Sequence, residues 1–501
     1  MILPCIMGVA CTNNDEPQNP DVLAYYVATD GNDSNVGSID SPLKSIKAAL
    51  EKAVPGYTIF VREGKYNEKI VFPKSGESGL NITLKAFPDE KVIIDGTGLT
   101  VAGKEALVTI RNVKFITLEG FEICNYISTR PYVIVNGITV DRGAEDITIR
   151  KNKIYNIEHN VLPGEGRNGH GIEIIGNTNV PLRNIFVEEN EIHDCNTGYS
   201  ENLTINGYVD GFVISKNKVY NGENIGIVAA GGYAANPIAA HNYVRNGIIS
   251  DNEVFNIDGT SGPVPAYEKH NGAIGIYVDG AQDIIVERNK VYDSGRGIGI
   301  VSETEGFPTM NCIVRNNFVY NNSLSGIYLG GYVGYTTGGT KNCGVVNNTL
   351  FANNKNLGYS NEVEGEIRLT ENCNDNIIKN NIIYARPNRG LFINKQSKGG
   401  SNNVIDYNLY YSQLLNRWTW DGVVYTNFSE WQTACKGDEK SIVGNDPMFV
   451  NIETPDLHIQ HHSPARQNGI VLTSEIYGTT DVDDEPRISN HKIDLGADQI
   501  N

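Results

Sequence analysis

The sequence predicts an all-β protein: a right-handed parallel β-helix solenoid with an N-terminal capping helix and a C-terminal closing segment. The first observation is a short motif with a central Asn that recurs along the chain, as in "SKNKVY", "ERNKVY" and "KNNIIY". Apolar residues alternate on both sides of each Asn, which is the period-two pattern of a strand. No helical period continues across this region. The pattern therefore indicates stacked coils of short strands, whereas a β-sandwich would need hairpin turns such as Asn-Gly between neighbouring strands.

The composition is that of a globular chain with an acidic balance. Of its 501 residues, 40% are hydrophobic and 20% are charged, and the net charge is −18. This charge argues against a nucleic-acid partner, because a basic surface is needed to displace counterions from phosphate. It also makes a neutral or metal-bridged ligand easier to bind than an anionic one. No stretch of 18 apolar residues occurs, so we expect no membrane span, and we expect a monomer.

The first element is a leader and linker over residues 1–22. The apolar residues "MILPCIMGVA" precede Cys11, and the polar, acidic run "TNNDEPQNP" follows it. This order resembles the end of a bacterial lipoprotein signal, and the acidic run resembles surface-exposed lipoproteins of Bacteroidetes-type bacteria. The resemblance implies export to the cell surface or periplasm, or secretion, with a lipid anchor at Cys11 as the membrane contact. The alternative is a short disordered tail.

The second element is a cap at the start of the solenoid, which we place at residues 23–411. The segment "SPLKSIKAALEKA" (41–53) begins with Ser-Pro and places Leu43, Ile46, Ala49 and Leu50 on one face. That spacing predicts an amphipathic helix covering the open first coil.

The coils themselves are marked by the recurring Asn. An inward Asn in one turn can hydrogen-bond the Asn of the next coil and satisfy the buried backbone there. Cys312, Cys343 and Cys373 occupy the same place in three successive repeats, and we interpret them as buried packing residues. The central residues of the motif are Asn152, Asn190, Asn217, Asn252, Asn289, Asn317, Asn348, Asn381 and Asn408.

The last element is a closing segment over residues 412–501, beginning near "NRWTWDGVVYTNFSEWQTACKG". A solenoid needs ends that differ from its repeats, and this segment lacks the repeat.

Two segments resemble a known family. The opening "YYVATDGNDSNVGSIDSPLKSIKAALEKAVPGYTIFVREGKYNEKIVF" and the closing "DPMFVN", "DLHIQHHSPARQNG", "DVDDEPR" and "DLGAD" resemble secreted right-handed β-helix carbohydrate-active proteins. These proteins have a DUF1565-type or polysaccharide-lyase-9-type N-terminus and belong to the pectate-lyase-like superfamily. The resemblance implies the fold and a role in polysaccharide biology. It does not select one reaction, because this fold hosts lyases, hydrolases, epimerases and non-catalytic proteins.

One outward face of the coils collects polar and aromatic residues. Strands aligned on their Gly-Ile start, such as "GIYVDG" and "GIGIVSE", send alternate residues outward. Gly299 lacks a side chain between Tyr277 and Tyr328 and predicts a notch there. The outward residues on this face are Glu173, Asn206, Tyr277, Asp279, Glu303, Tyr328 and Arg368.

Asp279 and Glu303 are the predicted catalytic pair. They fall on adjacent coils, displaced by two residues, which gives a separation between about 5 and 8 Å. Retaining glycosidases need carboxyls about 5–5.5 Å apart and inverting ones about 6.5–9.5 Å, so the spacing leaves both mechanisms open. Two acids this close would raise the pKa of one of them. The pair also resembles the acids of β-helix glycoside hydrolases in strand and spacing.

Long excursions between the central coils predict a binding cleft. They span residues 196–208, 229–244, 258–271, 304–311 and 330–341, and their tyrosines suit stacking on sugar rings. We expect Glu201, Asn206, Tyr277, Tyr328, Tyr332, Arg368 and His270 to bind substrate.

The sequence favours a glycoside hydrolase that needs no cofactor and acts on a polysaccharide or oligosaccharide. The first alternative is a polysaccharide lyase on a uronic-acid polymer, with Ca²⁺ and a base such as Arg368, His270 or Lys395. Under that alternative, Glu364, Glu366 or Asp279 would hold the metal. The second alternative is a non-catalytic glycan-binding lipoprotein.

Overall fold

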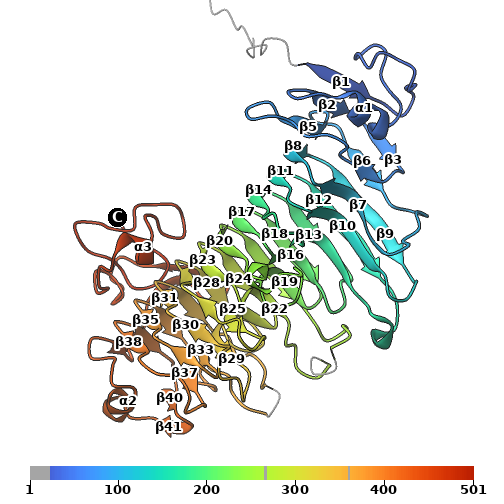
Figure 1. The fold of residues 1–501 in the computed structure, drawn as a ribbon. Coiled ribbons are helices and arrows are strands. Elements are labelled where there is room, and N and C mark those ends of the chain that lie inside the picture. The colour runs from blue at the N-terminus through green and yellow to red at the C-terminus, as the bar shows by residue number, and fades with distance from the viewer. Residues whose placement is uncertain (1–22, 265–267, 359–360) are drawn as a thin grey trace, which may run out of the picture.

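The computed structural model describes residues 23–264, 268–358 and 361–501, and these residues form a right-handed parallel β-helix. Three long sheets run side by side along the solenoid, and each coil adds one strand to each sheet in turn (Figure 1). The predicted leader with Cys11 lies outside the described residues. None of the described helices is long and apolar enough to cross a membrane.

The first sheet begins at β1. Its strands are β1 (Ala24–Val27), β2 (Thr58–Val61), β5 (Ile82–Ala86), β8 (Lys114–Glu119), β11 (Glu145–Arg150), β14 (Arg183–Glu188), β17 (Asp210–Ser215), β20 (Arg245–Ser250), β23 (Gln282–Glu287), β27 (Ile313–Arg315), β31 (Gly344–Val346), β35 (Ile377–Lys379) and β38 (Val404–Asp406), with β26 (Thr309–Met310), β30 (Thr340–Lys341) and β34 (Cys373–Asn374) alongside.

The second sheet carries the outward face singled out above. Its strands are β4 (Ile70–Val71), β7 (Lys104–Arg111), β10 (Ile134–Asp141), β13 (Gly169–Gly176), β16 (Glu201–Gly207), β19 (Ile225–Ala230), β22 (Ile274–Asp279), β25 (Arg296–Ser302), β29 (Ile327–Gly331), β33 (Ile367–Leu369), β37 (Leu391–Lys395), β40 (Arg417–Trp420) and β41 (Val423–Tyr425). Every neighbouring pair is parallel except β40 with β41.

The third sheet completes each coil. Its strands are β3 (Gly64–Tyr66), β6 (Val92–Asp95), β9 (Glu122–Ser128), β12 (Lys153–His159), β15 (Glu191–His193), β18 (Lys218–Gly222), β21 (Glu253–Ile257), β24 (Lys290–Tyr292), β28 (Phe318–Tyr320), β32 (Thr349–Phe351), β36 (Ile382–Tyr384), β39 (Leu409–Tyr411) and β42 (Ile442–Val443). Strands β40 and β42 therefore continue the sheets past residue 411, where the sequence placed the end of the solenoid.

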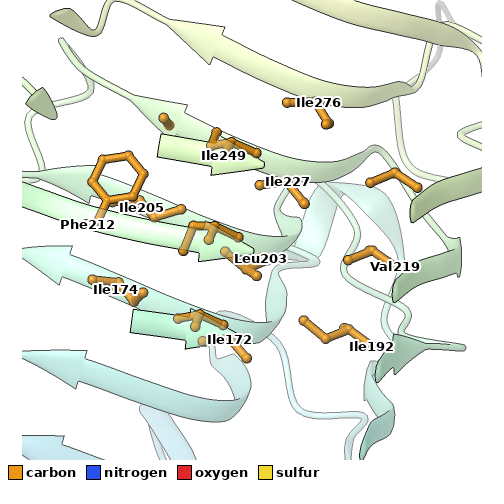
Figure 2. Packing of buried hydrophobic residues seen from close by; sticks show 14 of the residues in the cluster. Ile172, Ile174, Ile192, Leu203, Ile205, Phe212, Val219, Ile227, Ile249 and Ile276 are labelled. Carbon is orange, nitrogen blue, oxygen red and sulfur yellow. The ribbon is translucent and has the colours of Figure 1, made fainter. Parts of the chain in front are cut away.

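The interior is filled by columns of aliphatic side chains. Ile172, Leu203, Ile227 and Ile276 pair in register on β13, β16, β19 and β22, and all are fully buried (Figure 2). A column of like side chains buries each apolar surface against the coils above and below, which is the main stabilising term in a solenoid.

The Asn ladder predicted from the sequence is confirmed. In Asn289, the backbone N–H and the side-chain Nδ2 both donate to Oδ1 of Asn317, at 2.9 and 3.0 Å, and the same pattern recurs from coil to coil. The residue before each ladder Asn has a left-handed backbone, as Arg288 does with φ 54°. That conformation costs about 1 kcal/mol for a residue with a Cβ, and the ladder hydrogen bonds offset it.

The repeated Gly before Ile has a steric cause. A Cβ on Gly275 would lie 2.4 Å from a methyl of Val291, and one on Gly297 would lie 2.4 Å from a methyl of Val319. Glycine is therefore required at these two positions, where the second sheet meets the third inside the coil.

One repeat alignment was wrong. Cys312 and Cys343 stack, with the Cys312 N–H donating to the Cys343 sulfur at 3.3 Å. The next position in that column is Asn376, whose Oδ1 accepts from the Cys343 N–H at 2.9 Å. Cys373 instead pairs with Thr340 in a short strand. An extra turn between Cys373 and Asn376 shifted the repeat by three residues.

Both ends of the solenoid are covered. Helix α1 (Ile46–Lys52) packs Ile46, Ala49 and Leu50 on the first coils, as predicted, although it starts at the N-cap Ser45. Helix α2 (Phe428–Cys435) closes the other end, where Trp418 and Trp431 are fully buried with ring centroids 5.9 Å apart.

The rest of the closing segment returns along the third sheet (Figure 1). Strands β43 (Phe449–Asn451) and β44 (Asp456–Ile459) form a hairpin whose Phe449 and Leu457 pack against Phe318 and Leu409. The short helix α3 (Ser474–Tyr477) contacts β27 and β31, and two 3₁₀ turns, Pro163–Glu165 and Ala239–His241, lie in loops. The second sheet is left uncovered by this segment.

Candidate active site

The register between β22 and β25 determines how Asp279 and Glu303, the predicted acid pair, lie relative to each other. Asp279 pairs with Val301, so Glu303, just after β25, lies two residues further along the next coil. Along the same column, Ala230 precedes Asp279 and Gly330 follows Val301. Asp279 is 1% exposed, and its carboxyl oxygens contact the Tyr233 hydroxyl and the Glu303 backbone N–H.

Hydrogen bonds hold the two carboxyls together. The Glu303 backbone N–H donates to Asp279 Oδ1 at 2.8 Å, and the Tyr277 hydroxyl donates to Glu303 Oε1 at 2.7 Å. The Tyr233 hydroxyl contacts Asp279 Oδ2 and also lies 3.3 Å from Glu303 Oε2. Because one hydroxyl reaches both groups, the facing carboxyl oxygens are at most about 6 Å apart.

Burial and mutual repulsion shape the proton affinity of the pair. Burial, followed by the charge of Glu303, holds the pKa of Asp279 well above that of an ordinary aspartate. The hydrogen bonds from Tyr233 and from the Glu303 N–H oppose this rise without cancelling it. The pKa of Tyr233 is raised by burial and then by the charges of Asp279 and Glu303, so its hydroxyl keeps its proton. The pair can thus retain one proton at a pH where isolated carboxyls are ionised.

A hollow of about 390 Å³ opens on one side of the pair. We call it the acidic hollow, because Glu173, Glu201, Asp279 and Glu303 line it together with His170. Its floor is apolar and comes from Ile225, Val228 and Ala230, with Thr204, Asn206, Tyr199 and Tyr233 around them.

The far end of the acidic hollow is a hydrogen-bonded cluster. The Thr204 hydroxyl donates to Glu201 at 2.7 Å, and His170 lies 3.6 Å from Glu201 and 3.7 Å from Glu173. Burial raises the pKa of Glu201 despite the opposing effect of His170. Glu173 accepts a hydrogen bond from Asn136 at 2.9 Å. Closely spaced donors and acceptors of this kind suit the hydroxyls of a sugar.

A second hollow of about 460 Å³ adjoins the first on the other side of Glu303. We call it the apolar hollow, because Val264, Ile274, Val301, Tyr328, Tyr332 and Val333 contribute to its lining, alongside Arg296, Arg368 and Glu371. Tyr277, Glu303 and Tyr332 line both hollows, so the two form one continuous cleft over the second sheet.

The two arginines of the apolar hollow share one carboxylate. Arg296 contacts Glu364 at 2.6 and 2.9 Å, and Arg368 contacts it at 2.7 Å. Glu364 is fully buried, and the positive charges of Arg296 and Arg368 outweigh that burial and hold its pKa at about 2. This pairing leaves Glu364 as a counter-ion rather than a metal ligand.

Loops from several coils form the walls of the cleft. The Tyr335 hydroxyl donates to the Glu303 carbonyl at 2.9 Å, and the Tyr199 hydroxyl donates to the Pro263 carbonyl at 3.2 Å. The predicted excursions 229–244, 258–271 and 330–341 thus border the cleft, whereas 304–311 contributes no residue to the lining of either hollow. About half of 196–208 is strand β16, which supplies Glu201 to the sheet.

The structure brings most of the predicted site residues together. Those that line the cleft are Glu201, Asn206, Tyr277, Asp279, Glu303, Tyr328, Tyr332 and Arg368. His270 lines neither hollow, and its Nδ1 lies 2.9 Å from the Leu357 carbonyl in a neighbouring loop. Its role in substrate binding stays a prediction.

The notch predicted at Gly299 is filled. The rings of Tyr277 and Tyr328 lean into it from both sides, with centroids 6.0 Å apart, and an added Cβ would meet them at 2.6–2.7 Å. Both tyrosines are therefore buried in the cleft floor instead of standing out as stacking platforms.

The bases and ligands suggested for a lyase have other partners. The Lys395 ammonium is buried against Asp421 and donates to the Ser397 carbonyl. Glu366 is fully buried and accepts from Asn353 at 2.7 Å. Among the described residues, a metal-like grouping of His458, Asp483 and Asp498 occurs in the closing segment, on the third sheet rather than in the cleft.

Tyr233 is the functional residue that the sequence reasoning missed. It lies in the predicted excursion 229–244, but nothing in the coil repeat fixes where a loop residue points. Its 44% exposed ring borders the acidic hollow while its hydroxyl reaches both acids. His170, Tyr199 and Thr204 were likewise not chosen. The alignment of coils could have placed Thr204 beside Glu173.

The fold and this cleft define a carbohydrate-active right-handed β-helix protein. A family model described as Pel9A-like, right handed beta helix region matches residues 25–231, and one described as right handed beta helix region matches residues 268–417. The chain is 33% identical over 458 residues to the uncharacterized protein YwoF of Bacillus subtilis, covering 91% of this chain and 94% of YwoF. It belongs to the same family as YwoF, and these matches confirm the resemblance to right-handed β-helix carbohydrate-active proteins that was drawn from the sequence.

Two further comparisons concern a pectate lyase and a protein solved in complex with xylose. The chain is 44% identical over 84 residues to pectate lyase PEL9 of Emericella nidulans, which covers 16% of this chain and 20% of that protein. A structure of XylC in complex with xylose has a TM-score of 0.52 and 13% identity, covering 95% of this chain and 98% of XylC. At that identity the likeness shows the shared fold.

Proposed function

We propose that this protein is a glycoside hydrolase that cleaves a neutral glycan with Asp279 and Glu303 as its paired carboxyls. The observation that carries the proposal is the pair itself: two acids at the floor of a cleft, bridged by the Tyr233 hydroxyl. The limit of about 6 Å between their facing oxygens fits the retaining arrangement better than the wider inverting one.

In a retaining reaction, one carboxylate attacks the anomeric carbon while the other carboxyl gives its proton to the glycosidic oxygen, and the glycosidic bond breaks. A water molecule then attacks the covalent intermediate, and the group that gave the proton takes one back. The raised pKa of Asp279 keeps the required proton on the pair. Tyr277 and Tyr233 hold the carboxyls in place through their hydroxyls.

The charges of the cleft support a neutral substrate. Among the residues that line the acidic hollow, only His170 can carry a positive charge, against four carboxyl groups, so the lining offers little to neutralise a uronic acid. Arg296 and Arg368, the arginines of the apolar hollow, both contact Glu364. A lyase would need a cation or a metal to neutralise a uronate, so hydrolysis is the better supported reaction.

The test is hydrolysis of a glycan panel by wild type and by the variants Asp279→Asn and Glu303→Gln. Neutral pentosides head the panel, because XylC is described with xylose. We expect each variant to lose at least about 10²–10⁴-fold in rate. Asp283→Asn, an exposed acid of the same coil on β23, is the matched control and should retain full activity.

Three readouts separate the reactions. New reducing ends without an unsaturated uronate product, unaffected by EDTA, indicate metal-independent hydrolysis. NMR of the first anomer released shows retention if the pair works as described. Unsaturated product that disappears with EDTA, or full activity in both variants, would overturn the proposal.

We also propose that the chain is exported and lipidated at Cys11, on the sequence pattern alone. Labelling of expressing cells with a radioactive fatty acid should mark the wild type and not Cys11→Ser. Equal labelling of both would show that Cys11 is not the anchor.

A further inference from the structure

We propose that the apolar hollow is a subsite for an aromatic aglycone. The sugar would occupy the acidic hollow, and a planar apolar leaving group would lie across Glu303 from it. This inference rests on the proposed hydrolase function and names the substrate class for the same cleft.

The cleft is chemically asymmetric about the acid pair. On the acidic side, His170, Glu201 and Thr204 offer a dense set of hydrogen-bonding groups. On the other side, Val301 and Tyr328 continue the apolar cluster that also forms the floor of the acidic hollow, and Val333 and Leu369 add apolar lining there. A glycone needs hydroxyl recognition, whereas an apolar surface is best covered by an apolar group.

The rim of the apolar hollow is also apolar and open to water. Tyr332 is 52% exposed and Val333 is 88% exposed, and both line the hollow. Exposed apolar side chains gathered at a concave site commonly mark a ligand surface. The volume of about 460 Å³ accommodates a bicyclic aromatic group. Aromatic ligands gain additional stabilisation by packing against tyrosine rings.

The charged groups of the hollow are engaged with one another. Arg368 and Arg296 both contact the buried Glu364, and the Arg296 guanidinium lies 5.4 Å from the centre of the Tyr328 ring. An acidic sugar would have to compete with Glu364 for these arginines. The Ser397 hydroxyl donates to Glu371. This arrangement favours an uncharged occupant over a uronate.

The test is titration of the full-length protein with 4-methylumbelliferone alone, followed by its fluorescence. We expect saturable binding to the wild type, weakened about tenfold by Tyr332→Ala and further in combination with Val333→Ser. Both side chains are exposed, so the variants should fold normally. Tyr199→Ala removes an exposed ring from the acidic hollow only, and it should leave the affinity for this probe unchanged.

Galacturonate is the second probe. Binding of galacturonate that is lost in Arg368→Met, with no binding of 4-methylumbelliferone, would overturn the proposal in favour of an acidic-sugar subsite. Equal affinity of all variants for 4-methylumbelliferone would also overturn it. The titration does not require catalytic turnover. If the probe binds in a way that depends on Tyr332 and Val333 but the protein has no hydrolase activity, the hydrolase proposal is wrong and the apolar subsite is supported.

Discussion

Replacing Tyr233 by Phe is the sharpest test of how the acid pair is controlled. The Tyr233 hydroxyl is the group that reaches both carboxyls, and it contacts Asp279 Oδ2 within the acidic hollow. A hydroxyl carries one proton, so it donates to one carboxylate at a time and can accept from the other carboxyl when that group is protonated. Removing it takes a donor away from the ionised form of the pair.

The size of the effect follows from the hydrogen bond that is lost. A hydrogen bond to a charged group contributes about 1.5–3 kcal/mol, and about 1.4 kcal/mol corresponds to one pKa unit. A donor to the carboxylate lowers the pKa, so its removal must raise it. The pair in Tyr233→Phe should therefore titrate about one to two units higher than in the wild type.

Two measurements check this shift. The shifts of the two limbs of the pH profile of kcat/KM to higher pH should together sum to about one to two units, because one hydroxyl supplies one hydrogen bond to the ionised pair. The carboxyl carbon signals of ¹³C-labelled aspartate should show the same shift for Asp279 without substrate. Tyr277→Phe is the matched control, because that hydroxyl donates to Glu303 alone, and it should leave the Asp279 signal nearly unmoved. An Asp279 titration that is identical in wild type and Tyr233→Phe would refute the reasoning.

Two buried glutamates give further predictions. Burial raises the pKa of Glu366 to about 7 from 4.5, so the folded state binds more protons between those values and stability falls as pH rises through them. Glu366→Gln should be about 3 kcal/mol more stable than wild type at pH 8 and equal at pH 4, measured by urea unfolding at both pH values. The neighbouring positive charges of Arg296 and Arg368 hold the pKa of Glu364 at about 2, so it contributes stability above pH 4.5 that is lost as pH falls toward 2. Glu364→Gln should lower the free energy of unfolding by about 3–5 kcal/mol at neutral pH, measured by the same urea unfolding. If the variant and the wild type are equally stable, Arg296 and Arg368 must find other partners.

The sequence was sufficient for most of what repeats from coil to coil, although the extra turn after Cys373 hid one repeat alignment. The Asn ladder follows from the recurring Asn, and the outward parity of Asp279 follows from alternation along the strand from Gly275, which the corner requires. The two-residue offset of Glu303 from Asp279 could be counted from that start. Only the separation of the carboxyls stayed open, because side-chain torsions decide it and sequence spacing does not.

The residues that were missed belong to segments outside the repeat. Tyr233 lies in an insertion whose conformation depends on tertiary contacts. One of these is the packing of Tyr243 on Phe307, whose ring centroids are 5.0 Å apart. His270 lies in another insertion, where its Nδ1 contacts the Leu357 carbonyl. Coil spacing holds no information about either segment. The error at Gly299 has a different origin: a missing side chain was interpreted as empty space, whereas close packing lets neighbouring rings fill it.

The site therefore arises where the repeat is interrupted. An uninterrupted β-helix presents columns of similar side chains and a nearly flat outer face. Here Asp279 is 1% exposed, and burial raises its pKa. The insertion after β19 brings Tyr233 to the acids, where its hydroxyl contacts both carboxyls. Without Tyr233, the two carboxyls would repel each other with no shared donor, and on an uncovered outer face both would be solvated. The solenoid sets the offset between Asp279 and Glu303, and the insertion supplies the hydroxyl that contacts both of them.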